Sequence, residues 1–310
     1  MDWTPLQRHA GRVALGFSGG KDSTILLWML RHAGLLDRVT VYHLDTGDLL
    51  PEMQAHVAAL REWCPHFVTV RTDARGWAAE HGEPSDLVPH SSHEFGQLME
   101  EGRKLSARYD CCAANLMAPV FIKVRDDGNT LLIRGTREDD MKRLPARSGD
   151  VIDGMEFFYP LQSWTESDVF AFVRRNNIPL PALYDVFKQG PECATCPAWW
   201  NEGRAPYLKA RHPALFAEYR ARMARVVEEV TPCLRHLNEV LADLAGDANE
   251  LGSSDGLVID PATHLNVGPT TPSSAELVRF PDNAGFGVPV GEGAFVHDPV
   301  SAGRHFNGAG

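Results

Sequence analysis

Short apolar runs alternate with longer amphipathic segments over the first 70 residues of the chain. Residues 13–17, 39–44 and 67–70 are runs of apolar and β-branched residues, which predict buried strands. The intervening residues 23–33 and 51–63 have the spacing of apolar positions that is typical of helices. Strands that alternate with helices predict an α/β fold: a doubly wound, mostly parallel sheet with helices on both faces.

The alternation continues less regularly in the middle of the chain. Residues 74–110 are mixed in character and indicate helices and a loop over the edge of the sheet. Residues 130–134 predict a further strand. Residues 164–176 predict a helix whose N-terminus is capped by Thr165 and Asp168.

The C-terminal third differs in composition from the rest. Residues 213–245 are rich in alanine and leucine and predict a helical part, with an interruption near Pro232. Glycine, proline, serine and asparagine dominate afterwards, which predicts an irregular tail. We therefore expect an α/β domain at 1–200, a helical extension at 201–250 and a tail at 251–310.

Composition and charge exclude several classes of protein. Of the 310 residues 44% are hydrophobic, as expected for a globular protein with a core. The net charge of −11 argues against broad independent binding of nucleic acid, although a partner protein can still present one. No apolar stretch approaches the roughly 18 residues of a membrane span, and the N-terminus lacks a signal-peptide pattern. Cytoplasm is the expected compartment, and no membrane partner is expected.

The first predicted strand is joined to the first predicted helix by Ser18-Gly19-Gly20-Lys21-Asp22-Ser23. A Gly-rich turn at a helix N-terminus binds anions, because the free N–H groups and the helix dipole both attract negative charge. Ser18, Ser23 and Thr24 add hydroxyl donors. Lys21 adds a positive charge, and Asp22 is expected to help hold a metal ion. The expected ligand is a chain of phosphates.

The hexapeptide is neither of two common phosphate-binding motifs. A Walker loop has Ser or Thr where Asp22 stands, and the dinucleotide fingerprint has a different spacing of glycines. It closely resembles the PP-loop of N-type ATP pyrophosphatases, which reads Ser-Gly-Gly-x-Asp-Ser. The resemblance implies that Mg-ATP is bound and cleaved between its α and β phosphates, with transfer of AMP to a substrate. It assigns catalytic roles to Lys21 and Asp22.

Four of the six cysteines form two pairs. Cys111 and Cys112 are adjacent, and Cys193 and Cys196 form a Cys-x-x-Cys. In a cytosolic enzyme such pairs indicate a metal site or catalysis rather than disulfides. The pattern resembles the [4Fe–4S] ligands of adenylyl-sulfate reductases, in which thiolates hold the cluster. Zinc in an all-cysteine site and four buried, unliganded thiols are the alternatives.

Three further segments are similar to the phosphoadenylyl-sulfate (PAPS) reductase family, so that the resemblance covers about residues 10–200. They are Leu44-Asp45-Thr46-Gly47 followed by Pro51-Glu52, Gly135-Thr136-Arg137, and a Pro-Leu-x-x-Trp-x-x-x-Asp-Val block from Pro160 to Val169. The resemblance implies a Rossmann-like fold of the adenine nucleotide alpha hydrolase type. It places Asp45, Gly135 and Arg137 in the nucleotide pocket beside the loop.

The residue types at these positions agree with that placement but leave alternatives. Asp45 follows a predicted strand, where a carboxylate can bind a ribose hydroxyl or a metal; a helix cap is the alternative. Arg137 follows another strand and can form bidentate bonds to phosphate oxygens, and a surface ion pair is the alternative. Lys142 and Arg143 would add charge to the same face.

Two features depart from the reductases. Reductases of this family carry a catalytic cysteine in a C-terminal Glu-Cys-Gly-x-His motif, whereas this sequence has no cysteine after Cys233. Their phosphate loop is usually degenerate, whereas this loop keeps Lys21 and Asp22. These features resemble the PP-loop subunit of DNA phosphorothioation systems. We therefore expect an ATP pyrophosphatase that adenylates a substrate and supports sulfur transfer with a [4Fe–4S] cluster.

Two other functions remain open. The chain is a sulfonucleotide reductase if Cys233 or a partner supplies the attacking thiol, or a non-catalytic nucleotide-binding subunit if the tail serves for docking. The expected partners are ATP or an adenylylated nucleotide and a sulfur donor or thiol-reductant protein. A nucleic-acid substrate presented by a partner, and assembly into a homo-oligomer or complex, are also expected.

Overall fold

The computed structural model describes most of the first 247 residues. The described ranges are 1–87, 104–140, 146–188, 190, 192–198 and 203–247. The expected tail at 251–310, together with Lys142 and Arg143, lies outside them.

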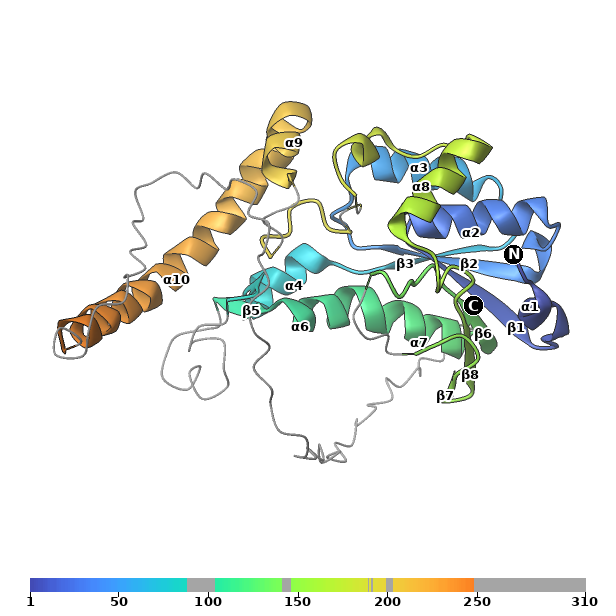
Figure 1. Cartoon of the computed structure of the whole chain (residues 1–310), viewed down its shortest axis with the longest axis horizontal. Coiled ribbons are helices and arrows are strands. Elements are labelled where there is room, and N and C mark those ends of the chain that lie inside the picture. Colours follow the sequence, from blue (N-terminus) through green and yellow to red (C-terminus); the bar gives the residue numbers. More distant parts are fainter. Residues whose placement is uncertain (88–103, 141–145, 189, 191, 199–202, 248–310) are drawn as a thin grey trace, which may run out of the picture. The chain divides into compact units, whose positions relative to one another are not determined.

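A six-stranded, mostly parallel sheet forms the centre of the protein, in the order β3-β2-β1-β6-β8-β7 (Figure 1). Only β7 pairs in the antiparallel direction. The strands are β1 (Arg12–Phe17), β2 (Val39–Asp45), β3 (Phe67–Arg71), β6 (Asn129–Ile133), β7 (Val151–Ile152) and β8 (Met155–Phe158). The predicted doubly wound α/β fold is confirmed.

Helices follow or connect these strands. They are α1 (Thr4–Arg8), α2 (Lys21–His32), α3 (Pro51–Arg61), α4 (Ala74–His81), α6 (Arg108–Cys112), α7 (Ala118–Asp126), α8 (Glu166–Asn176), α9 (Arg204–Arg211) and α10 (Pro213–Asp247). Short 3₁₀ turns occur at Leu36–Arg38 and Ala182–Asp185, and a π-helical turn at Ala113–Met117. A second, two-stranded parallel sheet pairs β4 (Glu83–Ser85) with β5 (Leu105–Ala107).

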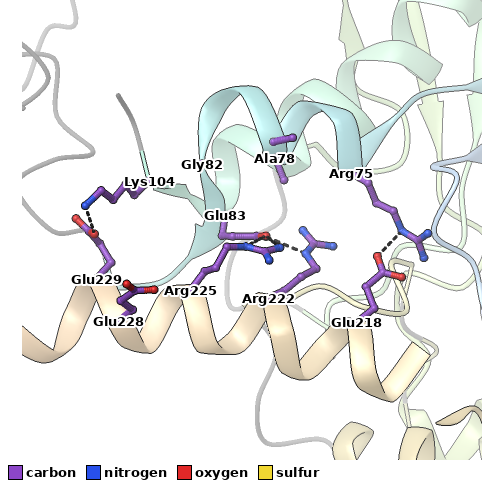
Figure 2. A pocket seen from close by; sticks show the side chains of 11 residues that line it. Arg75, Ala78, Gly82, Glu83, Lys104, Glu218, Arg222, Arg225, Glu228 and Glu229 are labelled. Atoms are coloured by element: carbon purple, nitrogen blue, oxygen red, sulfur yellow. Dashed lines mark hydrogen bonds and ion pairs between the residues drawn. The ribbon is translucent and has the colours of Figure 1, made fainter. Parts of the chain in front are cut away.

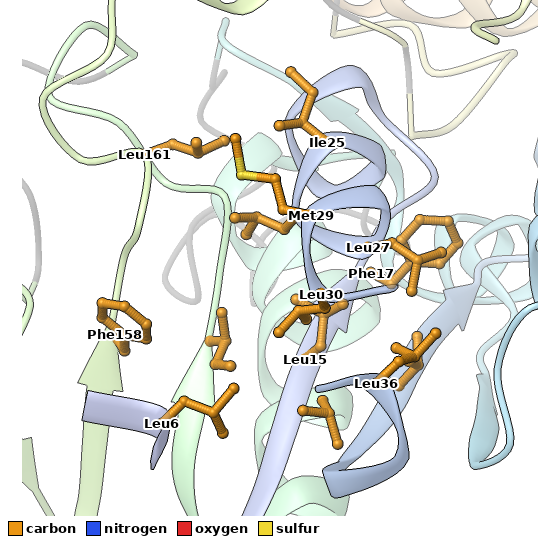
Figure 3. Close-up of a cluster of buried hydrophobic side chains, with 14 of the residues drawn as sticks. Leu6, Leu15, Phe17, Ile25, Leu27, Met29, Leu30, Leu36, Phe158 and Leu161 are labelled. Atoms are coloured by element: carbon orange, nitrogen blue, oxygen red, sulfur yellow. The ribbon is translucent and has the colours of Figure 1, made fainter. Parts of the chain in front are cut away.

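Apolar side chains cover both faces of the sheet. Successive side chains of a strand point to opposite faces, so Leu15 and Phe17 of β1 lie on one face and Ala14 on the other. Leu15 and Phe17 pack with apolar residues of α2 (Figure 3). The same cluster includes apolar residues of α3 and α8. Ala14 packs with Leu132 of β6 and Val124 of α7. A sheet buried on both faces explains why its strands read as nearly continuous apolar runs.

The strand order reverses direction at β1. From β1 the chain proceeds to β2 and β3 on one side, and then crosses back to β6 on the other side of β1. The segments that follow β1 and β6 therefore diverge, and in open α/β sheets ligands bind at such a point. The predicted phosphate loop and the segment from Gly135 to Arg137 both lie there.

The predicted C-terminal helix is longer and more regular than expected. The interruption predicted near Pro232 is wrong, because α10 continues through this residue to Asp247. Pro232 lacks the N–H that would donate to the carbonyl of Glu228, and this is one missing hydrogen bond in a helix of 35 residues. Within the described residues, no helix is both long enough and apolar enough to cross a membrane.

Candidate functional site

The predicted phosphate loop forms a tight turn between β1 and α2. Gly19 has a φ of +80°, in the left-handed region, and a Cβ at this position would lie 2.7 Å from Val57 of α3. The Ser18 hydroxyl accepts a 3.2 Å hydrogen bond from the N–H of Gly20, and the Ser23 hydroxyl donates to the carbonyl of Gly20 at 3.1 Å. The loop is therefore held in shape by its own hydroxyl groups.

Two buried cations stand at the start of α2, with a carboxylate between them. Lys21 is 3% exposed, and its Nζ lies 3.2 Å from Oδ2 of Asp22. Arg137 is 1% exposed, and its Nε lies 2.9 Å from Oδ1 of Asp22. The sequence separates Arg137 widely from the loop, but the structure brings it to the loop as predicted.

Arg137 is paired with carboxylates of its own segment as well. Its Nη1 donates to Asp139 at 3.3 Å, and its Nη2 donates to Asp140. The pKa of Asp140 is raised by burial and by the charge of Asp22, and Arg137 opposes this shift. Arg137 does form an ion pair with Asp139, but this pair is not the surface pair considered from the sequence, because the guanidinium is buried.

Gly135 lets the end of β6 approach the start of α2. A Cβ at this position would lie 2.9 Å from Cβ and 3.1 Å from the carbonyl carbon of Asp22. The second of these atoms belongs to the backbone and cannot move aside cheaply. Glycine is therefore required here by close packing, because its φ is not in the left-handed region.

Replacing Gly135 by Ala is expected to lower the free energy of unfolding by about 1–3 kcal/mol, since the methyl group overpacks the junction of β6 and α2. Urea unfolding measures this. Gly16→Ala in β1 is the control, because the nearest atom to its Cβ lies 3.5 Å away, in ordinary contact. Equal stability of the two variants would contradict the packing argument.

Asp45 ends β2 at the same edge of the sheet. Its Oδ1 accepts a 3.0 Å hydrogen bond from the N–H of Gly47, and its Oδ2 lies 3.8 Å from Nε of Arg71. The carboxylate thus stabilises the turn after the strand and caps no helix, which removes the alternative considered from the sequence. Its contact with a nucleotide stays a prediction.

Tyr184 contacts the loop and was not singled out from the sequence. Its hydroxyl accepts a 2.9 Å hydrogen bond from the N–H of Lys21, the first residue of α2. It would also lie 2.8 Å from a Cβ at Gly190. Burial raises the pKa of Tyr184 to about 12, so the hydroxyl is protonated near neutral pH. The two partners are 163 positions apart, and no local pattern indicates their contact.

The four predicted cysteine ligands come from two segments near the same edge. Cys111 and Cys112 end α6, where the helix passes into the π-helical turn. The Thr72 hydroxyl, just after β3, donates a 3.0 Å hydrogen bond to the carbonyl of Asn115 in this turn. The Cys193 thiol donates to the Thr46 hydroxyl, just after β2, at 3.6 Å. The carboxyl ends of β2 and β3 therefore position the two pairs.

The Cys-x-x-Cys loop is fixed by a buried carboxylate that the sequence did not reveal. The N–H and the hydroxyl of Thr195 donate to Oδ2 of Asp48 at 3.0 and 2.9 Å. Asp48 is 1% exposed and also forms a 2.8 Å ion pair with Arg75. On the other side of the loop, Nη1 of Arg204 donates to the carbonyls of Cys193 and Cys196 at 3.0 and 3.1 Å.

A network of charged residues connects Asp48 to α10, where Arg222 lies 3.7 Å from the Asp48 carboxylate. Figure 2 shows the part of this network around Glu83, Arg222 and Arg225. Arg222 of α10 donates to the Thr195 hydroxyl at 3.0 Å and to Glu83 at 2.8 Å. Arg225 pairs with the same Glu83. Glu83, Arg222 and Arg225 line a cavity of about 480 Å³. The long C-terminal helix thereby supports the position of the cysteines.

The cysteines are all free, and burial disfavours their charged forms. Burial raises the pKa of Cys111 to about 12 and that of Cys112 to about 11, and it also raises the pKa values of Cys193 and Cys196. A negative charge on Cys196 would raise the pKa of each of the other three, so the thiols lie within electrostatic reach of one another. In the described part of the chain, no three Cys, His, Asp or Glu side chains are grouped closely enough to hold one metal ion.

The sequence matches the phosphoadenosine phosphosulfate reductase domain over residues 12–190, more than half of the chain. The chain belongs to the phosphoadenosine phosphosulfate reductase family. The match includes the loop, Asp45, Arg137 and the first cysteine pair. It ends just before the second pair.

Relatives within and around this family are enzymes. Adenosine 5′-phosphosulfate reductase of Allochromatium vinosum is 33% identical over 236 residues, which cover 67% of this chain and 86% of the relative. Sulfate adenylyltransferase subunit 2 of Allorhizobium ampelinum is 28% identical over 191 residues, 56% of this chain and 57% of the relative. The crystal structure of PAPS reductase from Candida auris, a phosphate complex, gives a partial match: 15% identity, a TM-score of 0.40, and coverage of 59% of this chain and 80% of that one.

Membership of the family confirms the predicted resemblance and the enzymatic nature of the chain. The roles predicted for individual residues, in binding a nucleotide or a metal and in catalysis, stay predictions. The geometry adds Tyr184 at the loop, and Asp48, Arg204 and Arg222 at the cysteines, to the residues predicted from sequence.

Proposed function

We propose that this chain binds ATP at the carboxyl ends of β1 and β6, cleaves it between the α and β phosphates, and transfers AMP to a substrate that then accepts sulfur. The observation that carries the proposal is the pair of buried cations, Lys21 and Arg137, joined by Asp22 at the N-terminus of α2. Buried charges are costly unless they are paired, so their retention at a ligand-binding edge supports a functional role.

The arrangement suits a reaction in which negative charge moves onto a leaving pyrophosphate. Lys21 and Arg137 are already oriented by Asp22, so they need no reorganisation when that charge develops. The N–H groups of the first turn of α2 and the helix dipole add to the positive potential. A phosphate has to compete with Asp139 and Asp140 for Arg137. The 47% exposure of Asp139 lets this carboxylate move away into solvent.

The expected metal ion at Asp22 stays a prediction. Each carboxylate oxygen of Asp22 lies near a cation, Lys21 or Arg137, and Oδ1 is buried without a hydrogen-bond partner among the described residues, so a metal ion would have to share or displace these contacts. We derive no step through a protein-bound Mg²⁺. A magnesium ion carried by the phosphates of ATP stays a prediction.

An iron–sulfur cluster fits the donor set formed by Cys111, Cys112, Cys193 and Cys196. Four free thiols from two segments are the donor type that such a cluster takes, and Cys196 lies within electrostatic reach of the other three. The zinc alternative stays open. When bound, a [4Fe–4S] cluster would supply a redox-active centre at these four cysteines. The protein's part is to fix the thiols, through Asp48 and Arg204.

Product analysis tests the proposed function directly. Anaerobically prepared protein with its iron and sulfide intact is incubated with ATP and candidate acceptors, and AMP and pyrophosphate are quantified. Formation of both products in equal amounts is expected with the correct acceptor. Their absence with sulfate, nucleic acid and small metabolites alike would count against it.

A sulfonucleotide reductase is the second candidate, favoured by the 33% identical relative that is matched over 86% of its length. In such a reaction a thiolate forms a bond to the sulfonyl sulfur as AMP leaves, and a second thiol then releases sulfite. Cys233 of α10 is exposed and is the candidate nucleophile in this chain. Sulfite release from adenylyl sulfate that is lost in Cys233→Ser would support this function over ATP cleavage.

Replacing Tyr184 by Phe is expected to strengthen ATP binding several-fold. The hydroxyl accepts a hydrogen bond from the N–H of Lys21 that a phosphate would use. Losing this competing hydrogen bond makes the free energy of ATP binding more favourable by about 0.5–1.5 kcal/mol. Isothermal titration calorimetry measures the dissociation constant, with Tyr109→Phe, at an exposed tyrosine, as the control. Weaker binding in Tyr184→Phe would mean that the hydroxyl binds the phosphate instead of competing with it.

A further inference from the structure

The peptide group between Gly19 and Gly20 has more conformational freedom than the rest of the phosphate loop. Glycine adopts backbone conformations on both sides of φ = 0, so the residue types alone do not fix the orientation of this group. A trans peptide is planar, and therefore the carbonyl of Gly19 and the N–H of Gly20 point in opposite directions. One orientation presents the N–H to a phosphate, whereas the flipped orientation presents the carbonyl oxygen, which repels it.

In the structure the carbonyl end of this peptide group is buried and the N–H end is directed outward. The Gly19 carbonyl accepts a 3.4 Å hydrogen bond from the hydroxyl of Thr24, a residue that is 0% exposed. The Gly20 N–H donates to the hydroxyl of Ser18, which is an exposed residue. This is the orientation that suits an anion.

His56 of α3 fixes the Thr24 hydroxyl from the buried side. Its Nε2 lies 3.1 Å from Oγ1 of Thr24. The hydroxyl has one hydrogen, which is donated to Gly19, so its oxygen accepts a hydrogen bond from the Nε2–H of His56. Burial lowers the pKa of His56 to about 4, and the ring is therefore uncharged near neutral pH. A relay of two hydrogen bonds thus runs from His56 through Thr24 to the Gly19 carbonyl.

The same face of α3 also encloses Gly19. Met53, His56 and Val57 are three and four residues apart, so they lie on one face of the helix. A Cβ at Gly19 would lie 2.7 Å from Val57 and 3.4 Å from Met53. His56 therefore adds a polar contact to a helix face that already packs on the loop.

We propose that His56 is a positioning residue for the phosphate loop: acting through Thr24, it holds the Gly19–Gly20 peptide group with its N–H toward the bound phosphate chain. The inference rests on the proposed function for the class of ligand, a chain of phosphates. It differs from the role expected for Thr24 from the sequence, in which this hydroxyl donates directly to a phosphate.

Isothermal titration calorimetry with inorganic pyrophosphate and with ATP tests the relay. His56→Ala is expected to raise both dissociation constants about three- to tenfold, the usual effect of losing one hydrogen bond. His56→Gln is expected to stay within about twofold of the wild type, because the glutamine amide can donate from nearly the same place as Nε2. His66→Ala, at an exposed histidine, is the control. Urea unfolding shows whether each variant remains folded.

A double-mutant cycle separates the relay from a direct contact between Thr24 and the phosphate. Thr24→Val removes the hydroxyl and keeps a side chain of similar shape. If His56 acts through Thr24, adding His56→Ala to Thr24→Val weakens binding no further. Additive losses would show that the two side chains act independently, and would overturn the proposal.

Nitrogen NMR of isotopically labelled histidine rings gives a readout that needs neither ligand nor turnover. The His56 signals, assigned by their absence in His56→Gln, are expected to show a protonated Nε2 at neutral pH. A proton on Nδ1 instead, or equal binding by His56→Ala and the wild type, would overturn the relay and leave the proposed function standing. Wild-type protein that binds pyrophosphate but forms no AMP would overturn the proposed function alone, and wild-type protein that binds neither ligand would overturn both.

Discussion

Replacing Lys21 by Ala is expected to lower the rate of AMP formation from ATP by about 10²–10³-fold, the loss seen when one preorganised donor to a developing negative charge is removed. Stability should change little, because Arg137 still pairs with Asp22 in the variant. Single-turnover kinetics with labelled ATP measure the rate.

The matched control for this substitution is Lys188→Ala. Lys188 has the same side chain, but it is 84% exposed and its only described contact is a 4.0 Å pair with Glu166. Its loss should leave the rate within a factor of about two, as for most exposed ion pairs. Equal rates for the two variants would show that Lys21 contributes nothing to the reaction.

Replacing Asp48 by Ala is expected to lower the free energy of unfolding by about 3–5 kcal/mol, the usual cost of removing one partner from a buried ionic network. The change leaves both donors of Thr195 without their acceptor and separates Arg75 and Arg222 from their shared carboxylate. The Cys-x-x-Cys loop then loses its side-chain hydrogen bonds to Asp48 and keeps the backbone hydrogen bond from the N–H of Ala194 to the carbonyl of residue 48. Iron and sulfide bound per chain after anaerobic reconstitution should therefore fall as well.

Urea unfolding of the iron-free protein separates the two parts of this expectation. Asp37→Ala serves as the control, since Asp37 is an exposed carboxylate of a short 3₁₀ turn. If Asp48→Ala is as stable as Asp37→Ala, then Asp48 does not stabilise the fold. A large loss of stability with normal iron content would show that the cysteines keep their positions without it.

The strands at 13–17, 39–44, 67–70 and 130–134 could be predicted because they are buried on both faces and therefore apolar throughout. β7 and β8 were missed, since strands of two and four residues are too short to show a period. Pro232 misled the prediction for α10, because helix-breaking tendency is a local preference that the remaining hydrogen bonds of a long helix can outweigh.

In the candidate site, too, some residues could be predicted from the local sequence and others could not. The loop, Arg137 and the cysteine pairs could be predicted because each lies in a short sequence motif whose residue types indicate phosphate or metal binding. Tyr184 and Asp48 could not, since their roles depend on partners 163 and 147 positions away that only the folded chain brings together. The sequence around an aspartate or a tyrosine does not indicate which distant backbone N–H its side chain will accept a hydrogen bond from.

The parallel sheet also separates the chemistry from a part of the protein that can be modified freely. The loops that enter β2 and β6 lie at the opposite edge from the nucleotide and cysteine segments, and they contain Gly34 and Gly128. Both glycines are exposed, and nothing lies within 4 Å of a Cβ built on either one. A fluorophore or an affinity tag inserted beside them would report on or immobilise the enzyme without approaching the residues that act on substrate.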